Sequence, residues 1–549
     1  MLEKDFVTTD VLIIGSGIAG LRASLAAKKY NISVLITTKG WGASPFITAI
    51  NAPLGHSDER DSPEVYYQDT LRGGVYLNNK QLVKVLASQA IPSIRELETL
   101  GMEFDKENGR YAQRLVSGGT YPRAIHKKDR AGSEIVDLLG KEAKRQKIRI
   151  LSPVMIVRIA KKGGKIIGAF GLDIKNGRFL IINAKAIILA TGGIGRLYEF
   201  TTYPNDITGQ GVALAYRVGA ELVDMEFIQF EPTAILHPKQ CYGMLIPTAM
   251  FGDGGKLVNE DGERFMLNSK YGSETKAQKH ELALVIAKEV REGRGTKHGG
   301  VYFNASTIAN KTMETYPFHF QKLLSAGFDL RRDSVEVGPA AHSSIGGVKI
   351  DEGCRTNIKG LFAGGEIVGG VHGANRIAGN GATEAIVFGK IAGESAGEYA
   401  IENSLQKISK DEILFEEEHL RKMIDTADSN RLTPSTVRSK LQKEVSRAGG
   451  LVRSAKTLER GIDKVEQIKE KRAKLLKATN MRELIQCLEI DSMLMLAEAI
   501  LKTALIRCES RGAHYRDDFP FLDDKRWLKN VLVKRRGDGS MGILACNIS

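Results

Sequence analysis

Residues 10–20 read Asp-Val-Leu-Ile-Ile-Gly-Ser-Gly-Ile-Ala-Gly, an apolar run that ends in the glycine pattern Gly15-x-Gly17-x-x-Gly20. A helical pattern follows, so the segment predicts a strand, a tight turn and a helix. In such a unit the first glycine permits the turn, the second lets the backbone approach a pyrophosphate, and the third lets helix and strand pack closely. The helix N-terminus then faces the phosphates. The stretch therefore predicts a dinucleotide-binding site near the N-terminus.

The strand predicted after this helix, residues 31–38, ends in a way that does not suit NAD. Sites for NAD place an acidic residue at the end of this strand, where it binds the ribose hydroxyls. Here the strand ends in Thr37 and Thr38, and Lys39 follows. This departure counts against a plain NAD site.

Composition describes an ordinary globular protein. Of the 549 residues, 42% are hydrophobic and 26% are charged, and a chain of this length is expected to form more than one domain. No apolar run approaches the ~20 residues that a membrane helix needs. Residues 1–9 lack the apolar centre of a signal peptide. We expect a cytoplasmic protein without a membrane span of its own, which reaches a membrane, if at all, through partner subunits.

The cysteines and the charge argue against two classes of site. The five cysteines are scattered without a Cys-x-x-Cys pair, so no zinc site or iron–sulfur cluster is predicted and we expect no metal. The net charge of +14 is dispersed except near residues 453–474 and 529–536. Because no nucleic-acid motif accompanies it, we expect no nucleic-acid binding. Attraction of an anionic substrate or an acidic partner protein explains the charge as well.

The chain is organised as two nucleotide-binding segments around an insertion. Residues 225–340 lack the alternation of strands and helices that is typical of a parallel sheet. After residue 340 a strand that ends at glycines occurs again, in Gly360-Leu-Phe-Ala-Gly-Gly-Glu-Ile367. Charged, helically periodic sequence follows. The predicted boundaries are 1–224 and 341–405 for the two nucleotide-binding segments, 225–340 for the insertion, 406–510 for a helical domain and 511–549 for a tail.

At this point the motifs together resemble one family, the flavoprotein subunits of succinate dehydrogenase and fumarate reductase, with L-aspartate oxidase as a close relative. The resemblance covers nearly the whole chain and is carried by residues 15–20, 190–198, 224–233, 254–266, 291–295, 341–347, 364–366, 372–380 and 510–518. It implies an α/β fold: a Rossmann-like FAD-binding domain split by an inserted α+β capping domain and followed by a C-terminal helical bundle.

The resemblance also implies FAD as the cofactor, bound across both nucleotide-binding halves. Many members attach FAD covalently to a histidine that follows a serine, and Pro45 occupies that place here. Because proline offers no nucleophile, we expect noncovalent FAD. The residues that the family pattern places along the cofactor are Gly15, Gly17, Gly20, Thr38, Lys39, Thr191, Gly192, Gly193, Glu366 and Asn380.

The family's reaction moves a hydride between flavin N5 and a carbon beside a carboxylate, and a proton is handled at the neighbouring carbon. By resemblance, Arg294 is the catalytic arginine, and His342 and Arg376 hold one substrate carboxylate. The planar guanidinium of arginine suits bidentate binding of a carboxylate. The resemblance therefore predicts Arg294, His342 and Arg376 as the catalytic set.

Two departures from the family pattern bear on the substrate. Glu231 stands where the family's second clamp has a histidine, and Pro247 stands where a hydroxyl residue assists it. Thr248 and Phe251 replace the acid and the arginine of the family's proton relay. Because a carboxylate repels a second carboxylate unless one is protonated, we expect a substrate with one carboxylate at the end of His342 and Arg376, either a small enoate or an amino acid-like compound. Its other end would be neutral, cationic or apolar.

Three functions stay open at this point. The first is an FAD-dependent oxidoreductase acting on a carbon–carbon bond beside a carboxylate, and the second is an L-aspartate oxidase. The third is a flavin-carrying electron-transfer subunit whose substrate site has changed. Reduced flavin needs an electron source or sink, so an iron–sulfur or other electron-transfer subunit is the expected partner.

Overall fold

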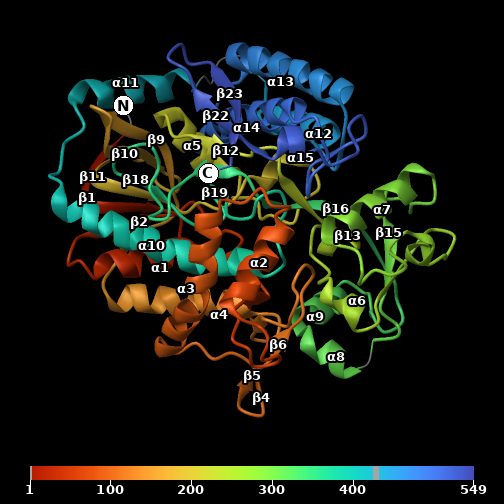
Figure 1. Ribbon diagram of the computed structural model, residues 1–549. Helices are drawn as coiled ribbons and strands as arrows, with labels where there is room; N and C mark the ends of the chain where they lie inside the picture. The colour runs from red at the N-terminus through yellow and green to blue at the C-terminus, as the bar shows by residue number, and fades with distance from the viewer. Residues whose placement is uncertain (1–2, 309, 425–431, 549) are drawn as a thin grey trace.

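The computed structural model describes residues 3–308, 310–424 and 432–548 and centres on a sheet of mixed direction (Figure 1). Its strands follow the order β8-β2-β1-β11-β10-β9, and β18 pairs with β11. The pairs among β8, β2, β1, β11 and β18 are parallel, and β9 and β10 extend the sheet in antiparallel fashion. The bounds are β1 Lys4–Ile14, β2 Val34–Thr37, β8 Arg149–Leu151, β9 Val154–Lys162, β10 Lys165–Asp173, β11 Phe179–Leu189 and β18 Leu361–Ala363.

The parallel strands end level with one another, and this edge carries the glycine turns. Ile14 pairs with Leu189 and with Thr37, and Leu189 pairs with Ala363. Ligands of open parallel sheets bind outside the carboxyl ends of the strands, so the register brings distant segments to one binding edge. Helices cover the sheet: α1 Ile18–Lys28 packs on α10 Asn380–Glu402, with α2 Pro63–Gly73, α3 Lys80–Thr99, α4 Ala131–Arg145 and α5 Gln210–Val218 around them.

Short strands connect these helices. A three-stranded sheet consists of β3 Ala49–Asn51, β7 Ala124–His126 and β6 Gln113–Arg114, and a hairpin of β4 Lys106–Glu107 and β5 Arg110–Tyr111 projects from the same region. Figure 1 shows this hairpin at the end of the molecule opposite α13.

The inserted segment forms a second unit with its own hydrophobic core (Figure 1, green). Its sheet has the order β13-β16-β15-β14, all antiparallel. The bounds are β13 Ile228–His237, β14 Lys256–Val258, β15 Val301–Asn304, β16 Val335–Ser344, α6 Ala249–Gly252, α7 Lys279–Arg291, α8 Asn310–Thr315 and α9 Pro317–Ser325. Strand β16 continues four residues past the predicted boundary at 340. The mixture of helices and antiparallel strands is the expected α+β capping domain.

The C-terminal part begins with helices and ends in a strand pair. Helices α12, α13 and α14 pack together, whereas α11 lies on the main sheet, where Glu416 pairs with Arg158 at 2.7 Å. The predicted tail is built into the structure, because β22 and β23 form a hairpin on β12 in a sheet of order β19-β17-β12-β22-β23. The bounds are α11 Lys410–Lys422, α12 Pro434–Ala448, α13 Ala455–Leu475, α14 Met481–Ile506, α15 Asp524–Trp527, β12 Leu222–Val223, β17 Gly347–Lys349, β19 Val368–Gly369, β20 Val452–Arg453, β21 Tyr515–Arg516, β22 Lys529–Arg535 and β23 Met541–Asn547.

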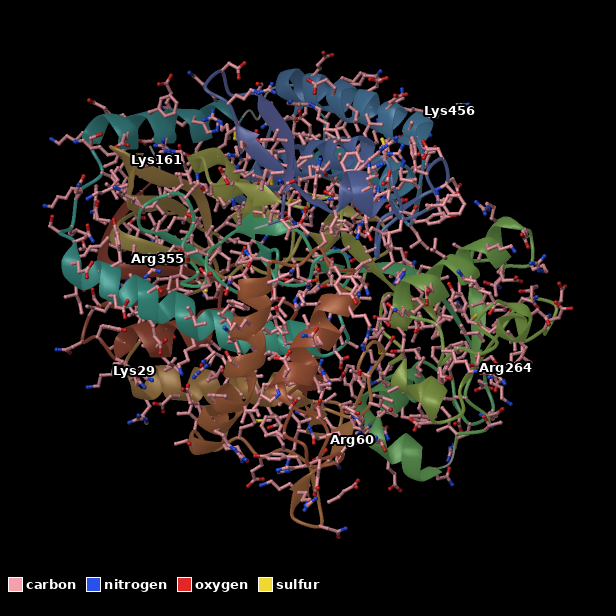
Figure 2. All side chains as sticks on the ribbon, in the orientation of Figure 1. Lys29, Arg60, Lys161, Arg264, Arg355 and Lys456 are labelled. Atoms are coloured by element: carbon pink, nitrogen blue, oxygen red, sulfur yellow. The ribbon has the colours of Figure 1, made fainter. Side chains whose placement is uncertain are left out.

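The basic residues labelled in Figure 2 come from segments spread along the chain, from Lys29 to Lys456, and lie around different sides of the molecule in this view. Within the described ranges, no helix has the length and apolarity to cross a membrane. The same ranges contain no group of at least three His, Cys, Asp or Glu side chains arranged to hold a metal ion.

Candidate active site

A cleft of about 2380 Å³ lies between the glycine edge of the main sheet and the capping domain. One wall carries Gly15, Gly17 and Thr191 from the sheet edge. The opposite wall carries capping-domain residues, among them Phe251 and Lys279. Sites between domains are common places for cofactors and substrates, so the cleft is the candidate active site.

The glycine turn is packed so tightly that side chains cannot replace its hydrogens. Gly15 has a φ of +113°, and a Cβ there would lie 2.2 Å from the carbonyl oxygen of Ala190. A Cβ on Gly20 would lie 2.0 Å from the carbonyl oxygen of Gly15. The Oγ of Ser44 accepts a hydrogen bond from the backbone N–H of Ile18 at 3.1 Å, which ties the residues before Pro45 to the start of α1. This is the geometry that a pyrophosphate-binding turn requires.

The predicted cofactor residues separate into two groups. Gly15, Gly17, Thr38, Lys39, Thr191, Gly192 and Glu366 line the cleft. The Oγ1 of Thr191 is buried and has no hydrogen-bond partner in the described part of the chain. Because buried polar atoms are normally satisfied, a bound ligand is expected to supply the missing partner. The cleft therefore fits a dinucleotide cofactor.

The other predicted cofactor residues, Gly20, Gly193 and Asn380, lie behind the cleft wall. Gly20 provides the close helix–strand approach. Asn380 is fully buried, and its Oδ1 accepts hydrogen bonds from Asn51 at 2.6 Å and from the hydroxyl of Tyr66 at 2.9 Å. It thus joins the start of α10 to neighbouring segments, which is a structural role in this conformation.

Glu366 lies at the end of the sheet edge and is held by several donors. Its Oε1 accepts hydrogen bonds from the Tyr203 hydroxyl, from the Ser343 hydroxyl at 3.1 Å and from the Ser344 N–H at 3.1 Å. Burial raises the pKa of Glu366 to about 6, although the hydrogen bonds from Tyr203 and Ser344 and the nearby charge of Arg376 oppose the rise. Its charge therefore changes within the physiological range.

This pKa shift predicts a pH-dependent stability. A carboxyl whose pKa is raised in the folded state stabilises the fold below its ordinary value of 4.5, and the contribution is lost as pH rises through about 6. The shift corresponds to about 2 kcal/mol. We expect the difference in free energy of unfolding between the protein and its Glu366→Gln variant to change by this amount between pH 4.5 and pH 7.5. Urea unfolding of the apoprotein measures it, and Glu352→Gln, at an exposed site, should show no such change.

Arg376 is buried, lines the cleft and has no carboxylate partner within the described residues. Its Nε donates to the Ser343 hydroxyl at 3.1 Å, one terminal nitrogen donates to the Gln229 Oε1 at 3.1 Å, and the other donates to the Ile377 carbonyl at 3.2 Å. All these acceptors are neutral. The guanidinium is thus held in place without a direct ion pair among the described residues, and Glu366 reaches it only through the Ser343 hydroxyl. This leaves room for a further anion at the guanidinium.

His342 lies beside Arg376 and lines the same cleft. Its Nδ1 is 2.8 Å from the Thr202 hydroxyl, and its Nε2 is 3.7 Å from Glu231 Oε2. Desolvation and the positive charges of Lys279 and Arg376 hold the pKa of His342 well below its usual value. The imidazole is therefore neutral near pH 7 and acts in the site as a hydrogen-bonding group.

Glu231 does not face the cleft, in contrast to what the sequence led us to expect. Its side chain is completely buried on β13, behind Lys279, whose Nζ donates to Glu231 Oε2 at 2.5 Å. Lys279 begins α7, lines the cleft and keeps only 10% of its side chain exposed. The structure thus places a paired lysine, not a free carboxylate, at this part of the wall.

Arg294 also lies elsewhere than the family resemblance implied. It follows the end of α7, and its guanidinium pairs with Glu289 at 2.7 Å and with Glu292 at 2.5 Å. Its side chain is 35% exposed, and it does not line the cleft. The physical reason is Gly293, whose φ of +84° turns the chain back so that Arg294 covers the helix end.

The remaining predicted residues are positioned along the cleft. Pro247, Thr248 and Phe251 line its capping-domain wall, and Pro45 lines it next to the start of α1. Phe251 also packs edge-to-face on Phe303, with ring centroids 5.7 Å apart. This end of the site is therefore largely apolar.

Comparison with known proteins agrees with this architecture. The FAD binding domain family matches residues 10–382, and the fumarate reductase flavoprotein C-terminal family matches residues 438–545. The chain belongs to the fumarate reductase and succinate dehydrogenase flavoprotein family. Its cofactor is FAD, and it is a flavoprotein oxidoreductase, as the sequence predicted.

The sequences of individual relatives align with almost the whole length of this flavoprotein. It is 37% identical to a protein of Methanothermobacter marburgensis that is named as one of the subunits of fumarate reductase (CoM/CoB), over 97% of this chain and 98% of the relative. It is 32% identical to L-aspartate oxidase from Yersinia pestis, over 93% of this chain and 96% of that protein. Among solved structures, Sdh1 of Mycobacterium smegmatis in complex with UQ1 is 31% identical and superposes with a TM-score of 0.90. This match covers 100% of this chain and 95% of that structure's chain.

Sequence reasoning missed several residues that complete the site of the flavoprotein. Lys279 belongs to Gln278-Lys-His-Glu281, which the sequence shows only as the capped start of a helix. Its partner Glu231 is 48 residues away, so the local sequence does not predict the ion pair. Tyr203 and Gln229 hold Glu366 and Arg376. Among these residues, Gln229 alone could have been found from the sequence, because it lies two residues before Glu231 in the family motif at residues 224–233.

Proposed function

We propose that this flavoprotein catalyses hydride transfer to or from a carbon–carbon bond next to a carboxylate, as a fumarate reductase does. One observation carries the proposal: Arg376 is only 8% exposed, lines the FAD cleft, and meets neutral acceptors alone among the described residues. A buried cation requires an anion, and a substrate carboxylate would provide it. His342 would add a neutral hydrogen bond to the same end.

Fumarate is the substrate that we propose first. The expected repulsion of a second carboxylate depended on a free Glu231, and this side chain is buried and paired with Lys279. The relative from Methanothermobacter marburgensis carries fumarate in its name. An enoate with one carboxylate is the second candidate, because Pro247 and Phe251 make one wall apolar.

The cofactor and the partner complete the proposal. FAD, when bound, supplies the hydride exchange, and Pro45 at the cleft supports noncovalent binding because proline cannot form the attachment. The name of the same relative describes it as one subunit of its enzyme. We therefore propose that electrons reach the flavin from a second subunit that carries iron–sulfur clusters, and that any membrane association occurs through such partners.

The test is turnover by the purified, FAD-loaded protein with a reduced viologen dye as electron donor. We expect fumarate to oxidise the dye, and crotonate, an enoate with one carboxylate, to react more slowly. Faster turnover of crotonate would favour the second candidate. Dye oxidation by neither compound would contradict the proposal.

L-aspartate oxidase is the alternative enzyme, supported by the 32% identity to the Yersinia pestis protein. Peroxide release with L-aspartate in air, faster than dye-linked fumarate reduction, would favour it. Normal flavin loading without turnover of any of these compounds would favour the third function, an electron-transfer subunit.

A further inference from the structure

Gln229 is a buried amide that contacts Arg376 at two places. It lies on β13 and is completely buried. Its Oε1 accepts a hydrogen bond from a terminal nitrogen of Arg376 at 3.1 Å, and its Nε2 donates to the backbone carbonyl of Arg376 at 2.8 Å. The same Nε2 donates to Asn375 Oδ1 at 2.8 Å. One side chain thus fixes both the guanidinium and the backbone of the same arginine.

The surrounding hydrogen bonds determine which way this amide points. Asn375 Nδ2 donates to the Gly73 carbonyl at 3.4 Å, so Asn375 Oδ1 faces Gln229. Both hydrogens of the Gln229 amide nitrogen then go to oxygen acceptors, and the carbonyl oxygen is left for Arg376. An ionised carboxylate has no donor hydrogens. At this position it would place an oxygen against two acceptor oxygens, so the local structure requires an amide.

The amide also differs from a carboxylate in charge. Hydrogen bonds between arginine and a carboxylate are roughly twice as strong as neutral ones and are frequently bidentate. A carboxylate in place of the Gln229 amide would therefore form a buried ion pair with Arg376. Such an internal partner would compete with any anion that enters the cleft.

Two carboxylates of the same region are bound by other groups. Glu366 accepts from the Ser343 hydroxyl at 3.1 Å, and the Ser343 oxygen in turn accepts from Arg376 Nε at 3.1 Å, so a neutral hydroxyl separates the carboxylate from the guanidinium. Glu231 is paired with Lys279 at 2.5 Å. Neutral groups thus hold Arg376 throughout the part of the chain that the structure describes.

We propose that Gln229 is a positioning residue of the substrate site, and that its neutrality is what the site requires; this inference rests on the proposed function. The amide holds Arg376 in place and leaves the guanidinium charge to a substrate carboxylate. Gln229 does not line the cleft, so it acts through Arg376 and not by touching the substrate. The strength with which the site binds a carboxylate is therefore set in part by a side chain behind its wall.

The main test is Gln229→Glu in the FAD-loaded protein, a change that keeps the shape and adds a charge. At pH 8.5, about four units above the ordinary pKa of glutamate, we expect KM for fumarate and the Kd of malonate, an unreactive dicarboxylate, each to rise about 100-fold. We expect kcat to stay within about fivefold and FAD content to stay normal. Dye-linked kinetics and calorimetry measure these values. KM and Kd within about threefold of the unmodified protein would overturn the proposal.

Gln229→Leu separates the charge from the fit of the side chain. This variant removes the same hydrogen bonds and adds no charge. We expect kcat to fall about tenfold, because the guanidinium is less well fixed, while the Kd of malonate rises no more than about fivefold. A merely structural role would affect both variants alike. Equal losses of malonate binding in Gln229→Leu and Gln229→Glu would therefore reject the role of neutrality.

Gln442→Glu is the matched control. The Gln442 amide, on α12, also donates to two backbone carbonyls, those of Arg196 at 2.7 Å and Tyr198 at 3.5 Å, and it does not line the cleft. We expect KM and the Kd of malonate to stay within about twofold. A rise as large as in Gln229→Glu would mean that the lost amide donors, and not the charge beside Arg376, weaken binding, and would overturn the proposal.

Failure of this inference can be told from failure of the proposed function. If the unmodified protein reduces neither fumarate nor crotonate, the proposed function fails, and the malonate titrations still test the role of Gln229. If the unmodified protein reduces fumarate and Gln229→Glu keeps the same KM and Kd, only this inference fails.

Discussion

Replacing Arg376 by methionine is expected to lower kcat/KM for fumarate about 1,000-fold, which corresponds to about 4 kcal/mol of lost transition-state stabilisation. The reason is that Arg376 is a buried cation without a carboxylate partner in the described chain, so a substrate carboxylate supplies the pairing that the protein omits. Methionine keeps much of the volume and removes the charge. Steady-state kinetics with the reduced dye measures the loss.

Controls separate substrate binding from damage to the fold. Arg376→Lys keeps the charge without the planar fork and should recover only part of the rate. Arg355→Met, at an exposed arginine, should leave kcat/KM unchanged within about twofold. In Arg376→Met we expect normal FAD content and no calorimetric binding of malonate. Malonate binding of ordinary strength in this variant would show that the carboxylate is held elsewhere.

The fold could be predicted largely from local sequence. The glycine pattern after an apolar run predicts a strand, a turn and a helix, and the contact of Gly20 with the Gly15 carbonyl lies within that unit. Gly15 itself meets the Ala190 carbonyl, at the end of a distant strand, so the same pattern also serves a contact that the local sequence does not specify. The C-terminal hairpin was not predicted, because β22 pairs with β12, a strand of two residues about 300 positions earlier. No local pattern specifies such a partner.

The site was predicted less completely, for a related reason. Arg294 lies between two glycines in a motif shared with the family, yet Gly293 turns it back onto Glu289. Lys279 lies in an ordinary helix start, and only the packing of α7 on β13 brings it to Glu231. Sequence patterns identify residues that repeat a family motif. They do not identify a buried pair that a particular chain has built from distant residues.

Replacing Gly15 by alanine is expected to remove most of the bound FAD and to lower the free energy of unfolding by about 3 kcal/mol. The methyl group would lie 2.2 Å from the Ala190 carbonyl oxygen at a φ of +113°, which side chains rarely adopt. Ile14 pairs with Leu189, so the two strand ends lie level and neither can move without separating from the other. Relief of the clash would therefore open the sheet edge that lines the cleft.

Two further glycine variants distinguish this clash from backbone strain alone. Gly163→Ala has a positive φ of +57° with open space around the new methyl group, so it should cost about 1 kcal/mol and leave FAD binding intact. Gly17→Ala would place a methyl group 2.8 Å from the Ser44 Oγ, a side chain that can rotate, so an intermediate loss of FAD is expected. The flavin-to-protein absorbance ratio and urea unfolding measure both effects. The overlap of the new methyl group with Ala190 cannot persist in a folded protein, so the backbone must move in Gly15→Ala. Full flavin occupancy in this variant would therefore show that the strand ends separate without opening the cleft, contrary to the prediction.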